Sequence, residues 1–293
     1  MSDVRIREVG PRDGLQAEAP LAVEGRVALI EALVAAGCRD VEAVAFVSPK
    51  AVPSMAGAAE VMAALDRSAG VRYWALVPNA RGAELAAAAG VDALSVTVSA
   101  SETYSQKNVK MSVEESVTAA GEIVRLWGDG PVDVVVSCAF GSPYEGDMAP
   151  AAVAALGRRL LDGGATSVTY ADTTGMATPR RIDELIAESG PDIGLHLHET
   201  RGTGLVNAYA ALEAGVRRFD TSVGGLGGSP FAAGAAGNLA TEDLVHLLDD
   251  LGMTTGIALD RLLTASELVA DLVGHPVPSR VAAAGPRTRL AAP

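Results

Sequence analysis

The sequence has few aromatic residues, only two cysteines, no long apolar run and no block of consecutive lysines or arginines. Two cysteines, Cys38 and Cys138, cannot build a disulfide framework, and both lie in apolar stretches where reduced thiols pack well. Apolar runs such as residues 134–140 are far shorter than the roughly 18 residues of a membrane span. The first ten residues show no secretory signal, so we expect a cytoplasmic protein without a membrane partner.

The net charge and the composition indicate which class of protein this is. The formal net charge is −13, and without a basic cluster the chain offers no footprint for nucleic acid. Of the 293 residues, 49 % are apolar and 20 % are charged, which is typical of a globular protein with a substantial core. We therefore expect no nucleic-acid partner.

Short β-branched runs alternate with longer segments rich in alanine and leucine up to about residue 250. Ser112 with Glu115 predicts a capping box, and Thr241 predicts the start of a later helix. Glycines at helix ends, including Gly37 and Gly163, predict left-handed caps. The predicted strands are 4–9, 40–46, 71–77, 93–98, 132–140, 167–172, 193–199 and 218–223.

Eight such units, spaced by about 31 residues, match an α/β fold of the (β/α)8 barrel type, which takes about 250 residues. A doubly wound sheet is the alternative, but the turn GPRDG after the first strand lacks the dinucleotide fingerprint. We predict one barrel domain over residues 1–275, including additional C-terminal helices. Residues 276–293, rich in Pro, Ala and Arg, are expected to form a poorly ordered tail.

Polar residues near the carboxyl ends of barrel strands are the candidates for function. Arg12 and Asp13 follow the first strand, although such a pair is also common in surface turns. His196 and His198 are two apart in a strand, so both imidazoles share a face and either ligate a metal or pack in the core. Glu42 lies in an apolar run and needs a partner such as Arg12.

A glycine-rich loop over residues 224–238 contains Ser229 and ends at Asn238, which fits a mobile lid or a flexible linker. Asp13, His196, His198 and the Asn238 amide oxygen would converge once the barrel closes. Two nitrogens and two oxygens, with substrate oxygens added, suit octahedral Mg²⁺ or Mn²⁺. A hydrolase with a zinc-activated water stays open as an alternative.

Motifs along nearly the whole predicted domain resemble the 3-hydroxy-3-methylglutaryl-CoA lyase family, among the metal-dependent lyase and synthase barrels. The resemblance implies a divalent cation, Mg²⁺ or Mn²⁺, and a CoA thioester substrate that is cleaved by retro-Claisen chemistry. The motifs are VGPRDGLQ (9–16), FVSPKAVPSM (46–55), SASETYSQKN (99–108), SCAFGSPYEG (137–146), ADTTGMATP (171–179), HLHETRG (196–202) and GGLGGSPFAAGAAGNLATED (224–243).

The resemblance also implies roles for single residues. The cation would be held by Asp13, His196, His198 and Asn238. The implied catalytic residues are Arg12, Asp13, Glu42, His196 and Ser229, with Asp13 or His196 as base and Arg12 stabilising the enolate. The implied substrate contacts are Arg12, Asn108, Thr169 and Arg201, with Asn108 toward the CoA part.

The sequence departs from the family pattern at the lid, where Ser229 replaces the usual cysteine of GGLGGCP. A serine hydroxyl is a far weaker acid than a thiol, whose pKa is about 8.5. The pocket positions Ala45, Val135, Glu199, Arg201 and Thr203 also differ from the family pattern. These changes favour an altered acyl substrate.

The predicted function is a metal-dependent lyase that cleaves a 3-hydroxy-3-methylglutaryl-CoA-like thioester to acetyl-CoA and a keto acid such as acetoacetate. A related lyase on a different acyl-CoA and a synthase that condenses acetyl-CoA with a keto acid are alternatives. A binding protein for metal and CoA that has lost turnover with Ser229 is the non-enzyme alternative. We expect a homo-oligomer, a dimer or tetramer.

Overall fold

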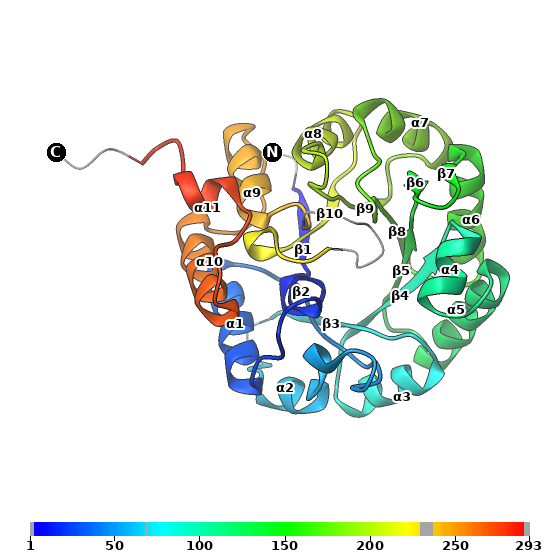
Figure 1. Cartoon of the computed structure of the whole chain (residues 1–293), viewed down its shortest axis with the longest axis horizontal. Coiled ribbons are helices and arrows are strands. Elements are labelled where there is room, and N and C mark those ends of the chain that lie inside the picture. The colour runs from blue at the N-terminus through cyan, green and yellow to red at the C-terminus, as the bar shows by residue number, and fades with distance from the viewer. Residues whose placement is uncertain (1–2, 68–69, 229–236, 290–293) are drawn as a thin grey trace.

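Eight parallel strands form the centre of the molecule and close into a barrel in the order β1-β10-β9-β8-β5-β4-β3-β2 (Figure 1). The structure is a computed structural model that describes residues 3–67, 70–228 and 237–289. The predicted (β/α)8 barrel is confirmed. The barrel strands are β1 (Arg5–Glu8), β2 (Asp40–Ala45), β3 (Arg72–Leu76), β4 (Ala93–Ser99), β5 (Val132–Ser137), β8 (Ser167–Ala171), β9 (Gly194–His196) and β10 (Arg218–Thr221).

Helices surround the barrel on the outside, as Figure 1 shows. A separate antiparallel pair, β6 (Gly141–Ser142) and β7 (Gly146–Asp147), follows β5. The short helical turns are η1 (Gly10–Gly14), η2 (Pro53–Met55) and η3 (Val223–Gly225). The α-helices are α1 (Val23–Ala36), α2 (Ala58–Ala64), α3 (Ala80–Ala88), α4 (Glu102–Asn108), α5 (Val113–Trp127), α6 (Pro150–Asp162), α7 (Pro179–Ser189), α8 (Gly204–Glu213), α9 (Thr241–Asp250), α10 (Leu259–Val273) and α11 (Arg280–Ala284).

Seven of the eight barrel strands are shorter than predicted at their carboxyl ends, whereas β4 extends one residue further, to Ser99. β9 ends at His196, and His198 instead forms an isolated antiparallel bridge with Asn238. The chain leaves the barrel ladder there because the loop before α9 supplies a pairing partner. The apolar and polar pattern of residues 193–199 does not reveal this change of partner.

Helix ends follow the predicted chemistry in part. The capping box of Ser112 and Glu115 at the start of α5 is confirmed. Gly163 was the wrong choice for a left-handed cap, because its φ is −74° and the following Gly164 has φ +98°. Thr241 begins α9, but its hydroxyl donates to the Glu8 carboxylate.

The C-terminal segment, which we expect to form a poorly ordered tail, includes the short helix α11 in its described part. Ser279 caps α11 through its hydroxyl, which accepts from the Ala282 N–H. The same hydroxyl donates to Asp243 on α9 over 2.8 Å, and Ser279 is buried. This tertiary contact attaches the segment to the barrel.

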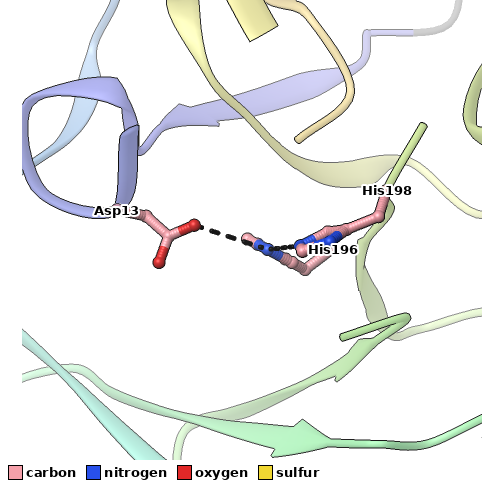
Figure 2. Close-up of side chains that lie close together, drawn as sticks. All are labelled: Asp13, His196 and His198. Carbon is pink, nitrogen blue, oxygen red and sulfur yellow. Dashed lines mark hydrogen bonds and ion pairs between the residues drawn. The ribbon is translucent and has the colours of Figure 1, made fainter. Parts of the chain in front are cut away.

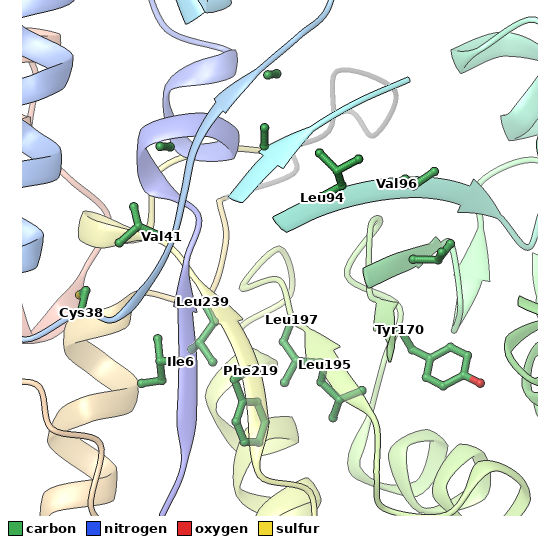
Figure 3. Close-up of a cluster of buried hydrophobic side chains, with 14 of the residues drawn as sticks. Ile6, Cys38, Val41, Leu94, Val96, Tyr170, Leu195, Leu197, Phe219 and Leu239 are labelled. Atoms are coloured by element: carbon green, nitrogen blue, oxygen red, sulfur yellow. The ribbon is translucent and has the colours of Figure 1, made fainter. Parts of the chain in front are cut away.

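The apolar core lies between the strands and the surrounding helices. Ile6, Phe219 and Leu195 pair across β1, β10 and β9 and belong to one cluster of buried apolar side chains (Figure 3). Cys38 and Cys138 are both buried free thiols, as predicted. Among the described residues, no helix is long and apolar enough to cross a membrane.

Candidate metal centre

Asp13 reaches the mouth of the barrel from η1, a single π-helical turn directly after β1. The N–H groups of Arg12, Asp13 and Gly14 all donate to the Val9 carbonyl, which folds the turn tightly. A side chain at Gly10 would place its Cβ 2.7 Å from both Glu8 Oε1 and Val223 Cγ1, so only glycine fits. The turn therefore presents Arg12 and Asp13 at the carboxyl end of the strand.

His196 is the last residue of β9, and His198 lies two residues further along the chain, with its ring beside that of His196. Their Nε2 atoms are 3.1 Å apart, and both rings are buried. His196 Nε2 lies 3.9 Å from Asp13 Oδ2, and one ligand atom from each of the three residues falls within 4.8 Å of the others. Figure 2 shows the Asp13 carboxylate pointing toward the two rings.

Asn238 completes the group from the loop before α9. Its Nδ2 donates to Asp13 Oδ2 over 2.8 Å and to the Leu226 carbonyl over 2.9 Å. Asn238 Oδ1 and His198 Nδ1 are buried and find no hydrogen-bond partner among the described residues. Buried acceptors without a partner are costly, and a cation beside them would supply one. The set of two imidazoles, a carboxylate and an amide therefore fits a divalent cation.

The protonation states also suit a cation. Burial raises the pKa of Asp13, but the Arg12 guanidinium and the His196 ring outweigh it and hold that pKa at about 2. Burial, together with the neighbouring His196 ring, lowers the pKa of His198 to about 3. At neutral pH the site therefore offers an ionised carboxylate and a neutral imidazole, the forms that bind metals.

Arg12 forms a buried ion pair with Glu42, as the sequence indicated. Arg12 Nε donates to Glu42 Oε2 over 2.5 Å, and its Nη1 donates to Asp13 Oδ1 over 2.6 Å. Glu42 is 1 % exposed, so the pair compensates the cost of burying its charge. No hydrogen bond of Arg12 Nη2 is seen with the residues the structure describes, which leaves this donor for a ligand.

The other predicted site residues are not brought to this cluster by their contacts. Asn108 is an exposed residue at the end of α4. Thr169 Oγ1 donates to Asp133 Oδ2, inside the barrel, and Thr169 lines a cavity at the amino ends of the strands. Arg201 is exposed and donates to the carbonyls of Thr174 and Gly175. Ser229 lies outside the described residues.

One neighbour of the cluster was missed in the sequence. Asp220 Oδ2 lies 3.4 Å from His196 Nδ1 and is buried. Burial raises the pKa of Asp220, but Arg7 and His196 overcome this and keep it well below its usual range. The sequence shows Asp220 only as an acidic residue in the predicted strand 218–223. Its contact with His196 depends on which strands pair, and the composition does not reveal the pairing.

The fold and the cluster define a barrel protein with a candidate divalent-metal centre at the carboxyl ends of its strands. The family model described as HMGL-like matches residues 3–269. The chain belongs to the HMGL-like family.

The similar proteins include lyases of CoA thioesters. The chain is 43 % identical to a hydroxymethylglutaryl-CoA lyase of Pseudomonas mevalonii over 94 % of each chain. It is 42 % identical to an (R)-citramalyl-CoA lyase of Chloroflexus aurantiacus, covering 98 % of this chain and 96 % of that protein. A solved HMG-CoA lyase from Acinetobacter baumannii, in complex with coenzyme A and 3-methylmalate, superposes with a TM-score of 0.93. That protein is 40 % identical, and the match covers 99 % of this chain and 97 % of the other.

Proposed function

We propose that this chain is a divalent-cation-dependent carbon–carbon lyase that cleaves 3-hydroxy-3-methylglutaryl-CoA to acetyl-CoA and acetoacetate. The observation that carries the proposal is the convergence of Asp13, His196, His198 and Asn238 at the barrel mouth. The similarity to hydroxymethylglutaryl-CoA lyases over nearly the whole chain supports the reaction class. Mg²⁺ and Mn²⁺ are the cations that suit this mixed set of ligands.

The cleavage needs a base, a place for developing charge and an acid. Asp13, His196, His198 and Asn238 would hold the cation, and a bound cation would make the tertiary hydroxyl of the substrate more acidic. Asp13, which is ionised, is the group of this chain that can accept the hydroxyl proton. The bond to the thioester α-carbon then breaks, so the hydroxyl carbon becomes a ketone and the electron pair forms an enolate.

Arg12 is the group that can stabilise this enolate. Its Nε and Nη1 are held by Glu42 and Asp13, so the guanidinium is already oriented before the reaction. A charge that is oriented in advance stabilises developing negative charge without reorganisation. We assign Glu42 the role of positioning Arg12.

A proton must finally reach the α-carbon to release acetyl-CoA, and we propose that Ser229 occupies the position of the proton donor. A thiol is a much better acid than a hydroxyl near neutral pH. We therefore expect Ser229→Cys to increase kcat on hydroxymethylglutaryl-CoA, measured by acetoacetate release. An unchanged or lower kcat would show that another group donates the proton.

The direct test measures product release by metal-stripped protein before and after addition of Mg²⁺ or Mn²⁺. We expect acetyl-CoA and acetoacetate in equal amounts, only with the cation present. Binding of Mn²⁺ and of CoA without any turnover would instead support a binding protein that has lost activity.

The similarity to a second lyase supports citramalyl-CoA as another candidate substrate. The (R)-citramalyl-CoA lyase matches this chain almost as well as the hydroxymethylglutaryl-CoA lyase does. Citramalyl-CoA should therefore be assayed in parallel, and acetyl-CoA with keto acids should be tested for condensation. A higher kcat/KM for one thioester identifies the acyl group. Cytoplasmic location and a homo-oligomeric state remain part of the proposal, and sedimentation tests the latter.

A further inference from the structure

A polar row lies directly beneath the candidate metal centre. The strand register pairs Arg7 of β1 with Asp220 of β10, and Asp220 with His196 of β9. Paired residues of neighbouring parallel strands point to the same side of the sheet. Arg7 also contacts β4 and β5 on the far side of the barrel, so this side is the barrel interior.

Arg7 is held from several directions in this interior. Its Nε and Nη2 donate to the two oxygens of Asp220 over 2.9 and 2.7 Å, which is a two-pronged contact. Its Nη2 also donates to Asp133 Oδ2 over 2.9 Å, and its Nη1 donates to Ser95 Oγ. The guanidinium carbon lies 4.9 Å from the centre of a Trp74 ring. Such a fork fixes the carboxylate as well as the guanidinium.

Asp220 in turn faces His196. Its Oδ2 lies 3.4 Å from His196 Nδ1, while the Nε2 of the same ring points toward His198 and Asp13. A carboxylate on one ring nitrogen favours a proton there, which leaves the other nitrogen with its lone pair. In metal sites, this arrangement fixes the tautomer and the ring orientation of the ligand.

We propose that Arg7 is a positioning residue for the metal centre, which fixes Asp220 so that Asp220 keeps the proton on His196 Nδ1 and His196 Nε2 faces the cation. This inference rests on the proposed metal centre. It adds a residue outside the group of ligands, from the strand that precedes the Asp13 turn.

The first test uses the unmodified protein without metal. Long-range ¹H–¹⁵N spectra report which nitrogen of each imidazole carries a proton, and the chain has only four histidines to assign. We expect His196 to carry a proton on Nδ1 at pH 8.5. A His196 ring with an unprotonated Nδ1 would overturn the proposal, whether or not the protein binds a metal or turns over a thioester.

The second test uses Arg7→Ala and measures Mn²⁺ affinity by calorimetry. Loss of a group that supports a metal ligand typically weakens metal binding by about 10- to 100-fold, and we expect a change of this size. Arg5→Ala is the matched control. Arg5 is an exposed residue of the same strand, and its substitution by alanine removes the same positive charge. We expect its Mn²⁺ affinity to stay at the wild-type value.

A cavity beneath the row allows a chemical rescue. It has a volume of about 390 Å³ and is lined by Arg7 and Asp220, so a small guanidinium ion can reach the space left in Arg7→Ala. Added methylguanidinium should restore Mn²⁺ affinity in Arg7→Ala and leave Arg5→Ala unaffected. A folded Arg7→Ala protein with wild-type Mn²⁺ affinity would overturn the proposal.

Arg7→Lys covers the case in which Arg7→Ala does not fold. Lysine keeps the charge between Asp220 and Asp133 but cannot form the two-pronged contact. We expect its His196 spectrum to show reduced protonation of Nδ1 and its Mn²⁺ affinity to fall. An unchanged spectrum together with unchanged affinity would overturn the role of Arg7. Absence of Mn²⁺ binding in the wild type would contradict the proposed function, while the imidazole spectra would still decide the positioning role.

Discussion

The partly buried carboxylate of Asp13 and the buried carboxylates of Glu8 and Glu242 lie near the same mouth of the barrel, and their pKa values shift in opposite directions. Asp13 lies beside Arg12 and His196, and these hold its pKa at about 2 against the effect of burial. Burial raises the pKa of Glu8 to about 7 and that of Glu242 to about 8, although neutral donors, including the Val223 and Gly224 N–H groups, oppose the rise. Cationic neighbours therefore separate a carboxylate kept charged from one that favours its proton.

The opposite pKa shifts indicate different roles for Asp13 and Glu8. Asp13 also accepts hydrogen bonds, from Arg12 and Asn238, but it is ionised and points toward two imidazoles, which suits the proposed metal ligand. Glu8 accepts from Gly10 N, Val223 N and Thr241 Oγ1, so both of its oxygens are used within the protein. Glu8 accepts from the Gly10 N–H of the turn that carries Asp13, whereas Asp13 is the proposed ligand of the cation.

The sharpest contrast comes from Asp13→Asn against Glu8→Gln. Asn at position 13 keeps the shape and loses the charge, so we expect Mn²⁺ affinity to fall by more than about 100-fold, beyond the usual effect of a residue that only supports a ligand. Glu8→Gln should bind Mn²⁺ as the wild type does. Calorimetry on both variants measures this, and retained binding in Asp13→Asn would remove Asp13 from the centre.

Arg12→Met removes the guanidinium group that lowers the pKa of Asp13. We expect kcat on hydroxymethylglutaryl-CoA to fall by about 10²- to 10³-fold, because the oriented positive charge that would stabilise the enolate is lost. Breaking a buried ion pair also destabilises, by about 3–5 kcal/mol, since Glu42 is left buried and charged. Urea unfolding separates the two effects.

Glu42→Gln supplies the control for that variant. Adding it to Arg12→Met should recover much of the lost stability, because the uncompensated charge is removed. Activity should stay low in the double variant. Recovery of both quantities would contradict a direct role of Arg12 in the reaction.

Glu8 predicts a pH dependence of stability opposite to that of Asp13. Its pKa is about 7 when folded and near 4.5 in an unfolded chain, so between these values the folded state binds more protons. The free energy of unfolding must then fall as pH rises from about 5 to 8. The loss is expected to reach a few kcal/mol.

Glu8→Gln isolates this effect, because glutamine imitates the protonated acid and does not titrate. We expect the wild type to lose stability relative to Glu8→Gln as pH rises from 5 to 8, in urea titrations at each pH. A constant difference between the two proteins across this range would show that Glu8 is ionised throughout.

The sequence predicts much of this arrangement, and the limits have a physical cause. Alternating β-branched and helical runs predict eight strands, and the carboxyl-end rule places Asp13, His196 and Asn238 in one mouth. Both follow from local pattern and a general rule of the fold.

Contacts that depend on register or on tertiary packing could not be predicted in this way. Arg7 and Asp220 are ordinary charged residues in predicted strands, and only the pairing of β1, β10 and β9 shows that they lie together. The short helix α11 depends on Asp243, which lies on another element, so the composition of the segment suggested a loose tail.

The smallest expected effect concerns the support of Glu8 and not its charge. Thr241 Oγ1 donates to Glu8 Oε2 over 2.5 Å and lies 2.7 Å from Thr221 Oγ1. Thr241→Val keeps the shape and removes this donor, so we expect a loss of about 1–3 kcal/mol in the free energy of unfolding. Mn²⁺ affinity should not change, because the bonds from Gly10 N and Val223 N still hold Glu8 in place. A fall in Mn²⁺ affinity together with stability would show that the two carboxylate groups are coupled through the Gly10–Gly14 turn.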